Sequence, residues 1–118
     1  MGFDIVGLSP KTATGRYFRN NIWWWLPMQE LITLACAEDL TEEEIIELGF
    51  NNGFAFNADK AELIGKRLTA ITEDERTLEL YRDYIFGVLP GVYEKCWSRE
   101  NIVEFAEFLE NCGGFEVW

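Results

Sequence analysis

The sequence lacks several of the residues on which enzyme sites usually depend. Its 118 residues include no histidine, so the commonest general base and the commonest metal ligand are both missing. The only serines are Ser9, which precedes a proline, and Ser98, which is placed to cap a helix, and neither resembles an activated nucleophile. No Walker or dinucleotide-binding glycine pattern occurs. We therefore expect a protein without catalytic residues, and not an enzyme.

Cysteine is scarce, and long apolar runs are absent. There are three cysteines, Cys36, Cys96 and Cys112, which is an odd number. They lie far apart in the sequence and include no C-x-x-C pair, so we expect buried thiols and neither disulfides nor a metal site. No apolar stretch approaches the roughly 18 residues of a membrane span, and residues 1–4 lack the basic region of a signal peptide. These absences predict a cytoplasmic protein with no metal, no cofactor and no membrane contact.

The chain does have enough apolar side chains for one hydrophobic core. Apolar residues make up 48% of the sequence and aromatic residues 15%, which excludes an intrinsically disordered chain. No linker, repeat or low-complexity tract divides residues 1–118, so we expect a single domain.

Residue patterning predicts an α+β domain that is mainly helical, with about five helices and a small sheet. The expected helices run from Pro27 to about Glu38, from Thr41 to about Gly49, from Ala58 to about Ile71, from Thr72 to about Val88 and from Arg99 to Cys112. Their expected start signals are Pro27 in a first turn, Thr41 and Thr72 in capping boxes, and Asn57 and Ser98 as caps. Residues 3–8 and 115–118 are expected to form strands that pair with each other.

Two finer features of this pattern can be checked against a structure. The buried face of the fourth helix is expected to consist of Tyr81, Tyr84, Ile85 and Val88. The Asn51-Asn52-Gly53 segment predicts a tight turn, because asparagine and glycine tolerate positive φ.

The net charge of −11 is unevenly distributed along the chain. Residues 1–29 contain one acidic and three basic side chains, so residues 30–118 contain the other 20 acidic and 7 basic side chains, a net charge of −13. Such a field disfavours direct binding to nucleic acid, because phosphate contacts depend on Lys and Arg. It attracts basic protein surfaces and accelerates association with them. An acidic surface also serves solubility alone, and that alternative stays open.

Two groups of carboxylates are the candidate partner-binding residues. The first group places six carboxylates within ten residues: Glu38, Asp39, Glu42, Glu43, Glu44 and Glu47. The second group is Glu100, Glu104 and Glu107, which share one face of the last helix because positions i, i+4 and i+7 align. Both patterns also suit a solvated helix surface. The second group repels itself without cations nearby, which favours a basic partner.

Residues 15–27, GRYFRNNIWWWLP, hold the most unusual pattern in the sequence. Three consecutive indoles cannot all point the same way, so at least one is expected to face a second cluster, a partner or a ligand. Guanidinium groups beside aromatic faces could hold a phosphate, a nucleotide or a carboxylate. The ligand-binding residues of this alternative are Arg16, Tyr17, Arg19, Asn20, Trp23, Trp24 and Asn52. The competing explanation is that the arginines pair with acidic helices and the aromatic rings form core.

This motif, the turn at residues 51–53, and residues 101–105 and 113–115 together resemble an uncharacterised family of small proteins of bacteria, phages and prophages. The resemblance covers both ends and the middle of the chain. Members of that family have Asn-Asp-Gly at the turn and often a zinc-ribbon-like insertion before the last helix. Only Cys96 lies in that region here, so no metal module is implied. The resemblance implies a small accessory protein of a mobile element, a setting in which inhibitors of host defence are frequent.

Charge and resemblance together predict a non-catalytic acidic binding protein that acts as a nucleic-acid mimic. Its partner would be a basic host protein, such as a nucleic-acid-binding defence effector, whose basic surface it occupies in the manner of an anti-CRISPR inhibitor. One alternative is a small-molecule binder or nucleotide sponge that uses the Arg/Asn/Trp motif. Another is a homodimeric structural protein whose surplus tryptophan closes the subunit interface.

Overall fold

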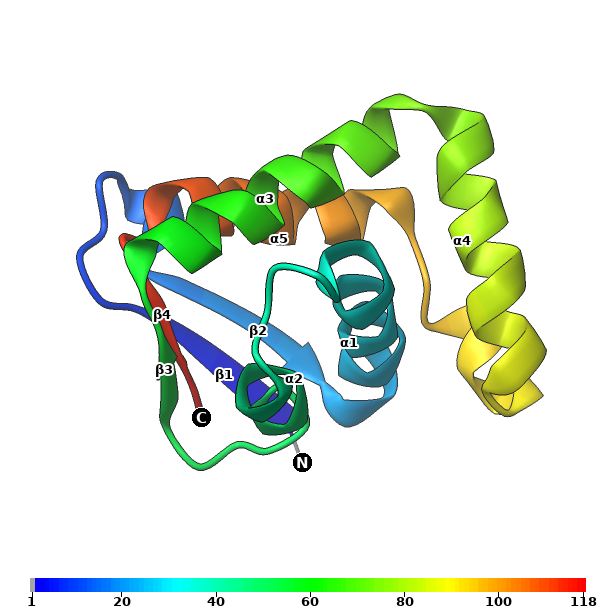
Figure 1. Cartoon of the computed structure of the whole chain (residues 1–118), viewed down its shortest axis with the longest axis horizontal. Helices are drawn as coiled ribbons and strands as arrows, with labels where there is room; N and C mark the ends of the chain where they lie inside the picture. The colour runs from blue at the N-terminus through cyan, green and yellow to red at the C-terminus, as the bar shows by residue number, and fades with distance from the viewer. Residues whose placement is uncertain (1) are drawn as a thin grey trace.

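Four antiparallel strands form the sheet on which the helices pack. The computed structural model describes residues 2–118, and Figure 1 shows its strands at one end of the molecule. The strands are β1 (Gly2–Gly7), β2 (Tyr17–Asn21), β3 (Phe54–Phe56) and β4 (Phe115–Val117), in the order β2-β1-β4-β3. The predicted terminal strands and their pairing are confirmed, whereas β2 and β3 are strands that the sequence pattern does not predict.

Strand residues alternate between a buried and an exposed side, so the helices cover only one face of the sheet. In β2, Phe18 and Asn20 are buried, whereas Tyr17 and Arg19 are exposed. The register places Asp4 of β1 opposite Arg19, so these two charged side chains share the exposed face. The exposed face carries Asp4, Tyr17 and Arg19, and the opposite face contributes aromatic rings to the core.

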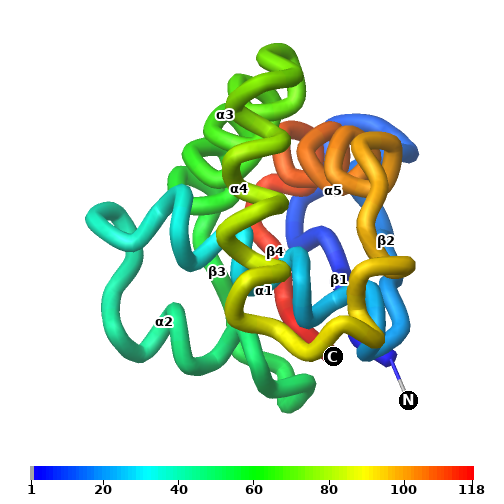
Figure 2. Tube along the Cα trace, turned by 90° about the vertical axis from the view of Figure 1, so that its right-hand side faces the viewer, coloured from blue at the N-terminus to red at the C-terminus, as the bar shows by residue number. Residues whose placement is uncertain are grey.

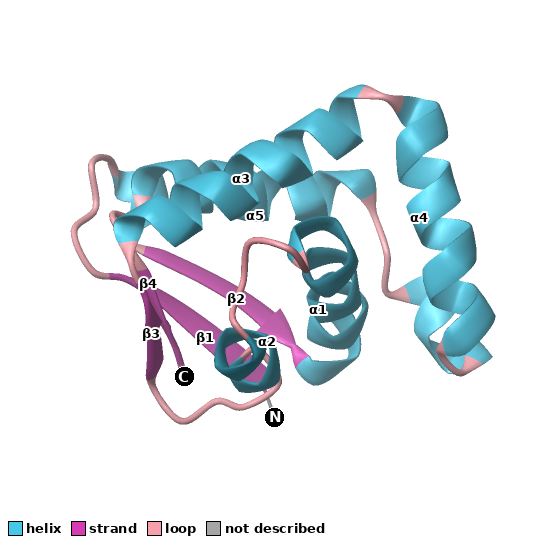
Figure 3. Ribbon diagram, in the orientation of Figure 1, coloured by secondary structure: helices cyan, strands magenta, loops and turns pink. Residues whose placement is uncertain are grey.

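Within residues 2–118 the structure contains five α-helices, which confirms the predicted mainly helical α+β fold (Figure 3). They are α1 (Ile22–Cys36), α2 (Glu42–Glu47), α3 (Ala58–Glu73), α4 (Glu75–Val88) and α5 (Arg99–Asn111). Two 3₁₀ helices, η1 (Ala13–Gly15) and η2 (Gly91–Lys95), precede β2 and α5. No helix in this part of the chain is long and apolar enough to span a membrane.

Helix α1 begins at Ile22, and its predicted start at Pro27 is wrong. The side-chain oxygen of Asn21 accepts hydrogen bonds from the backbone N–H groups of Trp23 and Trp24, at 3.0 and 3.1 Å. Asparagine at this position satisfies donors of the first turn, so the helix starts there and continues through Pro27. The tryptophans therefore lie in helical geometry and point in different directions.

Three of the other predicted helix starts are confirmed. Thr41 and Glu44 form a reciprocal capping box, with hydrogen bonds of 3.1 and 2.8 Å. The side chains of Asn57 and Ser98 each accept a hydrogen bond from a backbone N–H three residues further on, at 2.8 and 3.0 Å. At residues 51–53 the structure has a bend at Asn52 in place of the predicted tight turn. Of these three residues only Gly53 has a positive φ, of +91°.

The cap of α4 is Asp74, and the capping box predicted at Thr72 is wrong. The Asp74 carboxylate accepts hydrogen bonds from the backbone N–H groups of Arg76 and Thr77. Thr72 is buried in the last turn of α3, where its hydroxyl donates to the Thr69 carbonyl at 2.9 Å. The residue between the two helices thus caps the second one.

The buried face of α4 also differs from the predicted one. Leu78 and Ile85 are buried and Tyr81 is half-buried, whereas Tyr84 and Val88 are 62% and 66% exposed. Leu78 and Ile85, which are seven residues apart, lie on the side of α4 that packs against α1 and α3. The adjacent row, which contains Tyr84 and Val88, faces solvent. The predicted face is therefore correct for Ile85 and wrong for Tyr84 and Val88.

Trp25 lies at the centre of the core and is 1% exposed. Its ring stacks on Phe3 with centroids 5.5 Å apart and meets Phe105 of α5 edge-on, also at 5.5 Å. Its indole N–H donates to the carbonyl of Leu48 at 2.8 Å. One side chain thereby joins the sheet, α1, α5 and the end of α2.

The three cysteines are free thiols, of which Cys36 and Cys112 are buried and Cys96 is half-buried. Burial raises the pKa of Cys36 from an ordinary 9.0 to about 11, and that of Cys112 in the same direction. Because only the thiolate reacts, we expect iodoacetamide at neutral pH to alkylate Cys96 first. Mass spectrometry should find Cys36 and Cys112 labelled only after denaturant is added.

The same pKa shift sets a pH dependence. The fold favours the neutral thiol of Cys36, so the contribution of this thiol to the free energy of unfolding is complete below about pH 9 and is lost as the pH rises through about 11.

For the iodoacetamide experiment, a Cys96→Ser variant is the control, and the native form of this variant should stay unlabelled. Labelling of Cys36 in that native variant would contradict the prediction.

Candidate functional site

The second group of predicted carboxylates forms a row on the exposed side of α5. Glu100, Glu104 and Glu107 are all exposed, while the opposite side of the helix carries the buried Ile102 and Phe105. None of the three carboxylates takes part in the ion pairs found among residues 2–118. We call this row the α5 acidic face. It carries three negative charges that no ion pair among residues 2–118 neutralises.

A cavity of about 290 Å³ lies beside this face, where α5 meets η1 and β2. Its lining residues are Ala13, Thr14, Tyr17, Phe18, Glu104, Glu107 and Phe108. Two carboxylates and a tyrosine ring therefore share one cavity with apolar rings. This combination suits a cation with apolar or planar character, such as the guanidinium of arginine or the ammonium of lysine with its aliphatic stem.

Tyr17 is held at the cavity by a polar network on the sheet. Its hydroxyl donates a hydrogen bond to Asp4, and Arg19 donates to the same carboxylate at 2.8 Å. The Tyr17 hydroxyl and then Arg19 lower the pKa of Asp4, and the bond to Asp4 raises the pKa of Tyr17. The tyrosine therefore stays a neutral donor, and the charge of Arg19 is paired with Asp4.

The first group of predicted carboxylates is divided by the fold. Asp39 pairs with Arg67 at 2.6 Å, and Glu44 pairs with Lys60 at 3.4 Å in addition to its role in the capping box. Glu47 is half-buried, with one carboxylate oxygen that is buried without a hydrogen-bond partner. The exposed members outside the ion pairs of residues 2–118 are Glu38, Glu42 and Glu43.

The two groups do not form one surface. Figures 1 and 2 place α2 and α5 at opposite sides of the molecule in both views. A partner that covers Glu42 and Glu43 would therefore approach from a different direction from one that covers the α5 acidic face. The α5 group is the one that adjoins a cavity lined by its own carboxylates.

The fold does not bring the residues of the alternative ligand site together. Tyr17 and Arg19 lie on the open face of the sheet, whereas Asn20 lies on the opposite face. The Asn20 side chain exchanges two hydrogen bonds with the amide of Asn101 on α5, at 2.9 and 3.0 Å. Trp23 is 48% exposed and packs against another ring, Tyr93, at a centroid distance of 5.3 Å.

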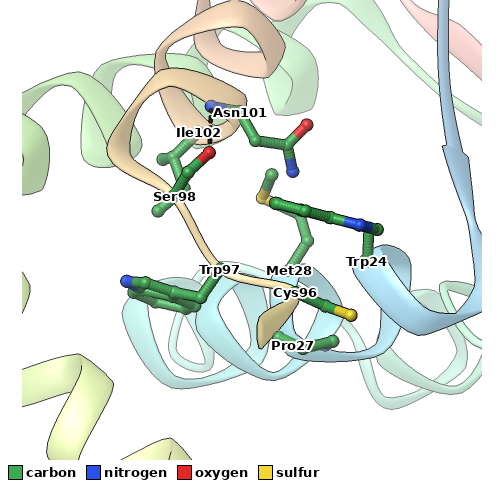
Figure 4. A pocket seen from close by; sticks show the side chains of 8 residues that line it. All are labelled: Trp24, Pro27, Met28, Cys96, Trp97, Ser98, Asn101 and Ile102. Atoms are coloured by element: carbon green, nitrogen blue, oxygen red, sulfur yellow. Dashed lines mark hydrogen bonds between the residues drawn. The ribbon is translucent and has the colours of Figure 1, made fainter. Parts of the chain in front are cut away.

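Trp24 lines a separate crevice between α1 and the start of α5. Figure 4 shows its ring over the side chain of Met28, with Cys96 below it. This crevice has no room for a water-sized molecule. Arg16 and Asn52 are exposed in other segments, before β2 and before β3. These positions favour a structural role for the aromatic and amide residues of the motif.

The comparisons with known proteins point to no relative. No family model, curated protein or solved structure matches the chain. The resemblance of the motif at residues 15–25 to phage and prophage proteins therefore stays a prediction. Among residues 2–118, no three acidic or thiol side chains are grouped so as to hold a metal ion.

The site contains residues that the sequence does not single out. Thr14, Phe18 and Phe108 line the cavity, and Asp4 holds Tyr17 in place. Their roles depend on the pairing of β1 with β2, which brings distant segments together. The sequence of β2, YFRNN, has no regular alternation of apolar and polar side chains, so no local pattern indicates this strand.

Proposed function

We propose that this chain is a non-catalytic binding protein that recognises a basic protein through the α5 acidic face and its cavity. The observation that carries the proposal is the row of three exposed carboxylates outside the ion pairs of residues 2–118, two of which line a cavity with a tyrosine ring. The net charge of −11 adds long-range attraction toward such a partner.

The cavity gives this attraction a specific anchor. An arginine side chain of the partner would enter it and pair with Glu104 and Glu107, with its guanidinium plane against the Tyr17 ring. A charge pair that is shielded from water is stronger than one on an open surface, and an arginine anchor is a frequent centre of binding energy in interfaces. Glu100, further along the row, would contact a second basic side chain.

The negative charge of the α5 acidic face indicates which class of protein would bind it. Proteins that bind nucleic acid carry clusters of Lys and Arg for contact with phosphates, and such clusters match a row of carboxylates. We therefore propose a host nucleic-acid-binding protein as the partner, with nucleic acid displaced when the complex forms. A defence effector inhibited in this way would agree with the mobile-element context that the sequence resemblance implies.

A charge-neutral variant tests the proposal. The triple variant E100Q/E104Q/E107Q removes the α5 charges while leaving the buried side of the helix unchanged. Capture from a host lysate at low salt, followed by mass spectrometry, should recover a basic nucleic-acid-binding protein with the wild-type chain. We expect the variant to bind it at least about tenfold more weakly, because each charged anchor in an interface is worth about 1–3 kcal/mol.

The matched control is E38Q/E42Q/E43Q, which removes the same charge from the other side of the molecule. It should keep the affinity within about threefold, since it alters only long-range attraction. Nucleic acid added to the captured complex should compete with the wild-type chain. Equal losses in both variants, or no basic partner at all, would contradict the proposal.

A further inference from the structure

Within residues 2–118, strand β2 lies at the edge of the sheet and pairs with β1 alone. Figure 2 shows it at the margin of the sheet, with α5 above it. An edge strand presents a row of unpaired backbone groups, to which a strand of another chain can add. With five residues, β2 has the length of an ordinary strand and offers several such groups.

The register shows which backbone groups of β2 face outward. The Arg16 carbonyl accepts a hydrogen bond from a backbone N–H of β1 at 2.9 Å. Hydrogen-bonded pairs recur at every second position of an antiparallel ladder, so Phe18 and Asn20 also direct their backbone groups toward β1. Tyr17 and Arg19 therefore direct theirs away from it. The Arg19 carbonyl accepts a hydrogen bond from the side chain of Asn20 at 3.0 Å, and the two outward N–H groups face the open edge.

Helix α5 runs along this edge. Near the end of β2, Asn101 of α5 exchanges two hydrogen bonds with Asn20. In the middle of the strand, the rings of Phe18 and Phe105 lie with their centroids 4.8 Å apart. Before the strand begins, the Asn111 carbonyl lies against η1. The α5 acidic face thus borders β2, and the cavity that both elements line lies between them.

The spacing of the carboxylates on α5 matches that of side chains on a strand. Glu100 and Glu104 are four residues apart, which is about 6 Å along a helix axis. Side chains on one face of a strand recur about every 6.6 Å. Two basic side chains at alternate positions of an added strand would therefore meet these two carboxylates, and the second would also reach Glu107. Arg16, the exposed basic residue before β2, is not among the residues that line the cavity.

We infer that an extended basic segment of the partner adds to the outer edge of β2 as an antiparallel strand, with Arg or Lys at alternate positions directed toward α5. The residue opposite Phe18 has its side chain on the face of the sheet that α5 covers, so a basic side chain there enters the cavity. This inference rests on the proposed function. It adds the conformation and the sequence pattern that the partner segment must have.

Charge disfavours a second copy of this chain at the same edge. Two-fold pairing of β2 with its counterpart would bring the α5 acidic faces of both copies to one seam. Each copy also has a net charge of −11. A basic segment neutralises the carboxylates that a second copy would repel.

The probe is the fluorescent peptide Thr-Val-Arg-Thr-Arg-Val-Thr, whose two arginines share one side when the peptide is extended. Anisotropy titration with the full chain at low salt should show saturable binding. The isomer Thr-Val-Arg-Arg-Thr-Val-Thr has the same charge but presents its arginines on opposite sides. It should bind at least about fivefold more weakly, because only one arginine can reach α5.

Methylation of the peptide backbone tests for pairing as a strand. With both arginines directed toward α5, the N–H of the central threonine faces β2 and the N–H groups of the arginines face away. N-methylation of the central threonine should therefore weaken binding at least about tenfold, and N-methylation of either arginine less than about threefold. Only a peptide that pairs as a strand should show this alternation.

Hydrogen exchange followed by NMR reports on β2 itself. With the peptide bound, the N–H groups of Tyr17 and Arg19 should exchange at least about tenfold more slowly, because they gain acceptors. Phe18 and Asn20, whose backbone groups already face β1, are the internal control and should change less than about threefold.

Charge variants link the edge to the α5 acidic face. E104Q/E107Q should weaken binding of the peptide at least about tenfold, because both carboxylates line the cavity. The matched control E42Q/E43Q removes the same charge from the other side of the molecule and should keep the affinity within about threefold.

Contrary results separate this inference from the proposed function. If E104Q/E107Q weakens binding but all methylated peptides lose affinity equally, or the amides of Tyr17 and Arg19 stay unprotected, the inference fails and the proposed function stands. Equal affinities of E104Q/E107Q and E42Q/E43Q would overturn both. A wild-type dimer in sedimentation analysis that protects the same amides without peptide would also overturn the inference.

Discussion

Replacing Trp25 by alanine should lower the free energy of unfolding by about 3–5 kcal/mol, the largest loss we expect from any one of the three consecutive tryptophans. The substitution removes a 1% exposed indole that contacts Phe3 and Phe105 and leaves the carbonyl of Leu48 without its hydrogen bond. Domains of this size have total stabilities of about 5–15 kcal/mol, so a substantial part of the fold's stability rests on this one ring. Urea denaturation followed by circular dichroism measures the change.

Trp23→Ala is the matched control for Trp25→Ala, because it removes the same side chain two positions earlier in the same helix. Trp23 is 48% exposed and packs against Tyr93 at the surface, so we expect a loss of about 0.5–1.5 kcal/mol. Trp24 is half-buried against Met28 and should fall between the two. Similar losses at all three positions would show that the indoles share one environment, contrary to the structure.

Two Gly→Ala substitutions should change stability in opposite directions. A Cβ at Gly15 would collide with the backbone carbonyl of Asn111 at the end of α5, so η1 would have to move away from the helix. We expect a loss of about 1–3 kcal/mol or more. A Cβ at Gly87, inside α4, meets no atom within 4 Å, and alanine is the better helix former there. Gly87→Ala should gain about 0.5–1 kcal/mol.

Chemical denaturation of Gly15→Ala and Gly87→Ala measures the two changes in the free energy of unfolding. Because both variants replace glycine by alanine, a difference between them reflects the position and not the type of substitution. Because Ala13 and Thr14 line the cavity beside the α5 acidic face, Gly15→Ala should also weaken capture of a basic partner. Gly87→Ala should leave that capture unchanged. A neutral or stabilising Gly15→Ala would mean that η1 does not contact α5 as closely as the structure places it.

Features determined by neighbouring residues could be predicted from the sequence. The caps at Thr41, Asn57 and Ser98 act on N–H groups three residues away, and all three are present. The start of α1 was mispredicted for a related reason. Pro27 suits a first turn, but Asn21 satisfies the donors of an earlier turn, and the proline is tolerated inside the helix.

Features that depend on pairing between distant segments could not be predicted. β2 and β3 exist because β1 and β4 supply their hydrogen-bond partners, and their own sequences are too short to signal a strand. The same distinction applies to the site. The row on α5 follows from helical spacing alone, whereas its cavity requires β2 and η1 beside the helix. The first carboxylate group is divided by Arg67 and Lys60 of α3, which no local pattern connects to it.

The central place of β4 in the sheet has a consequence for the order of folding during synthesis. β3 pairs only with β4, and Ile5 near the start of the chain lies opposite Val117 near its end. The ribosome must therefore release residues 115–117 before β3 gains any partner, while α3 and α5 can already form. Contacts over such sequence separations slow folding to milliseconds or longer. Until β4 is available, the edges of β1 and β3 that pair with it stay unpaired, and these edges are where a chaperone would protect the nascent chain.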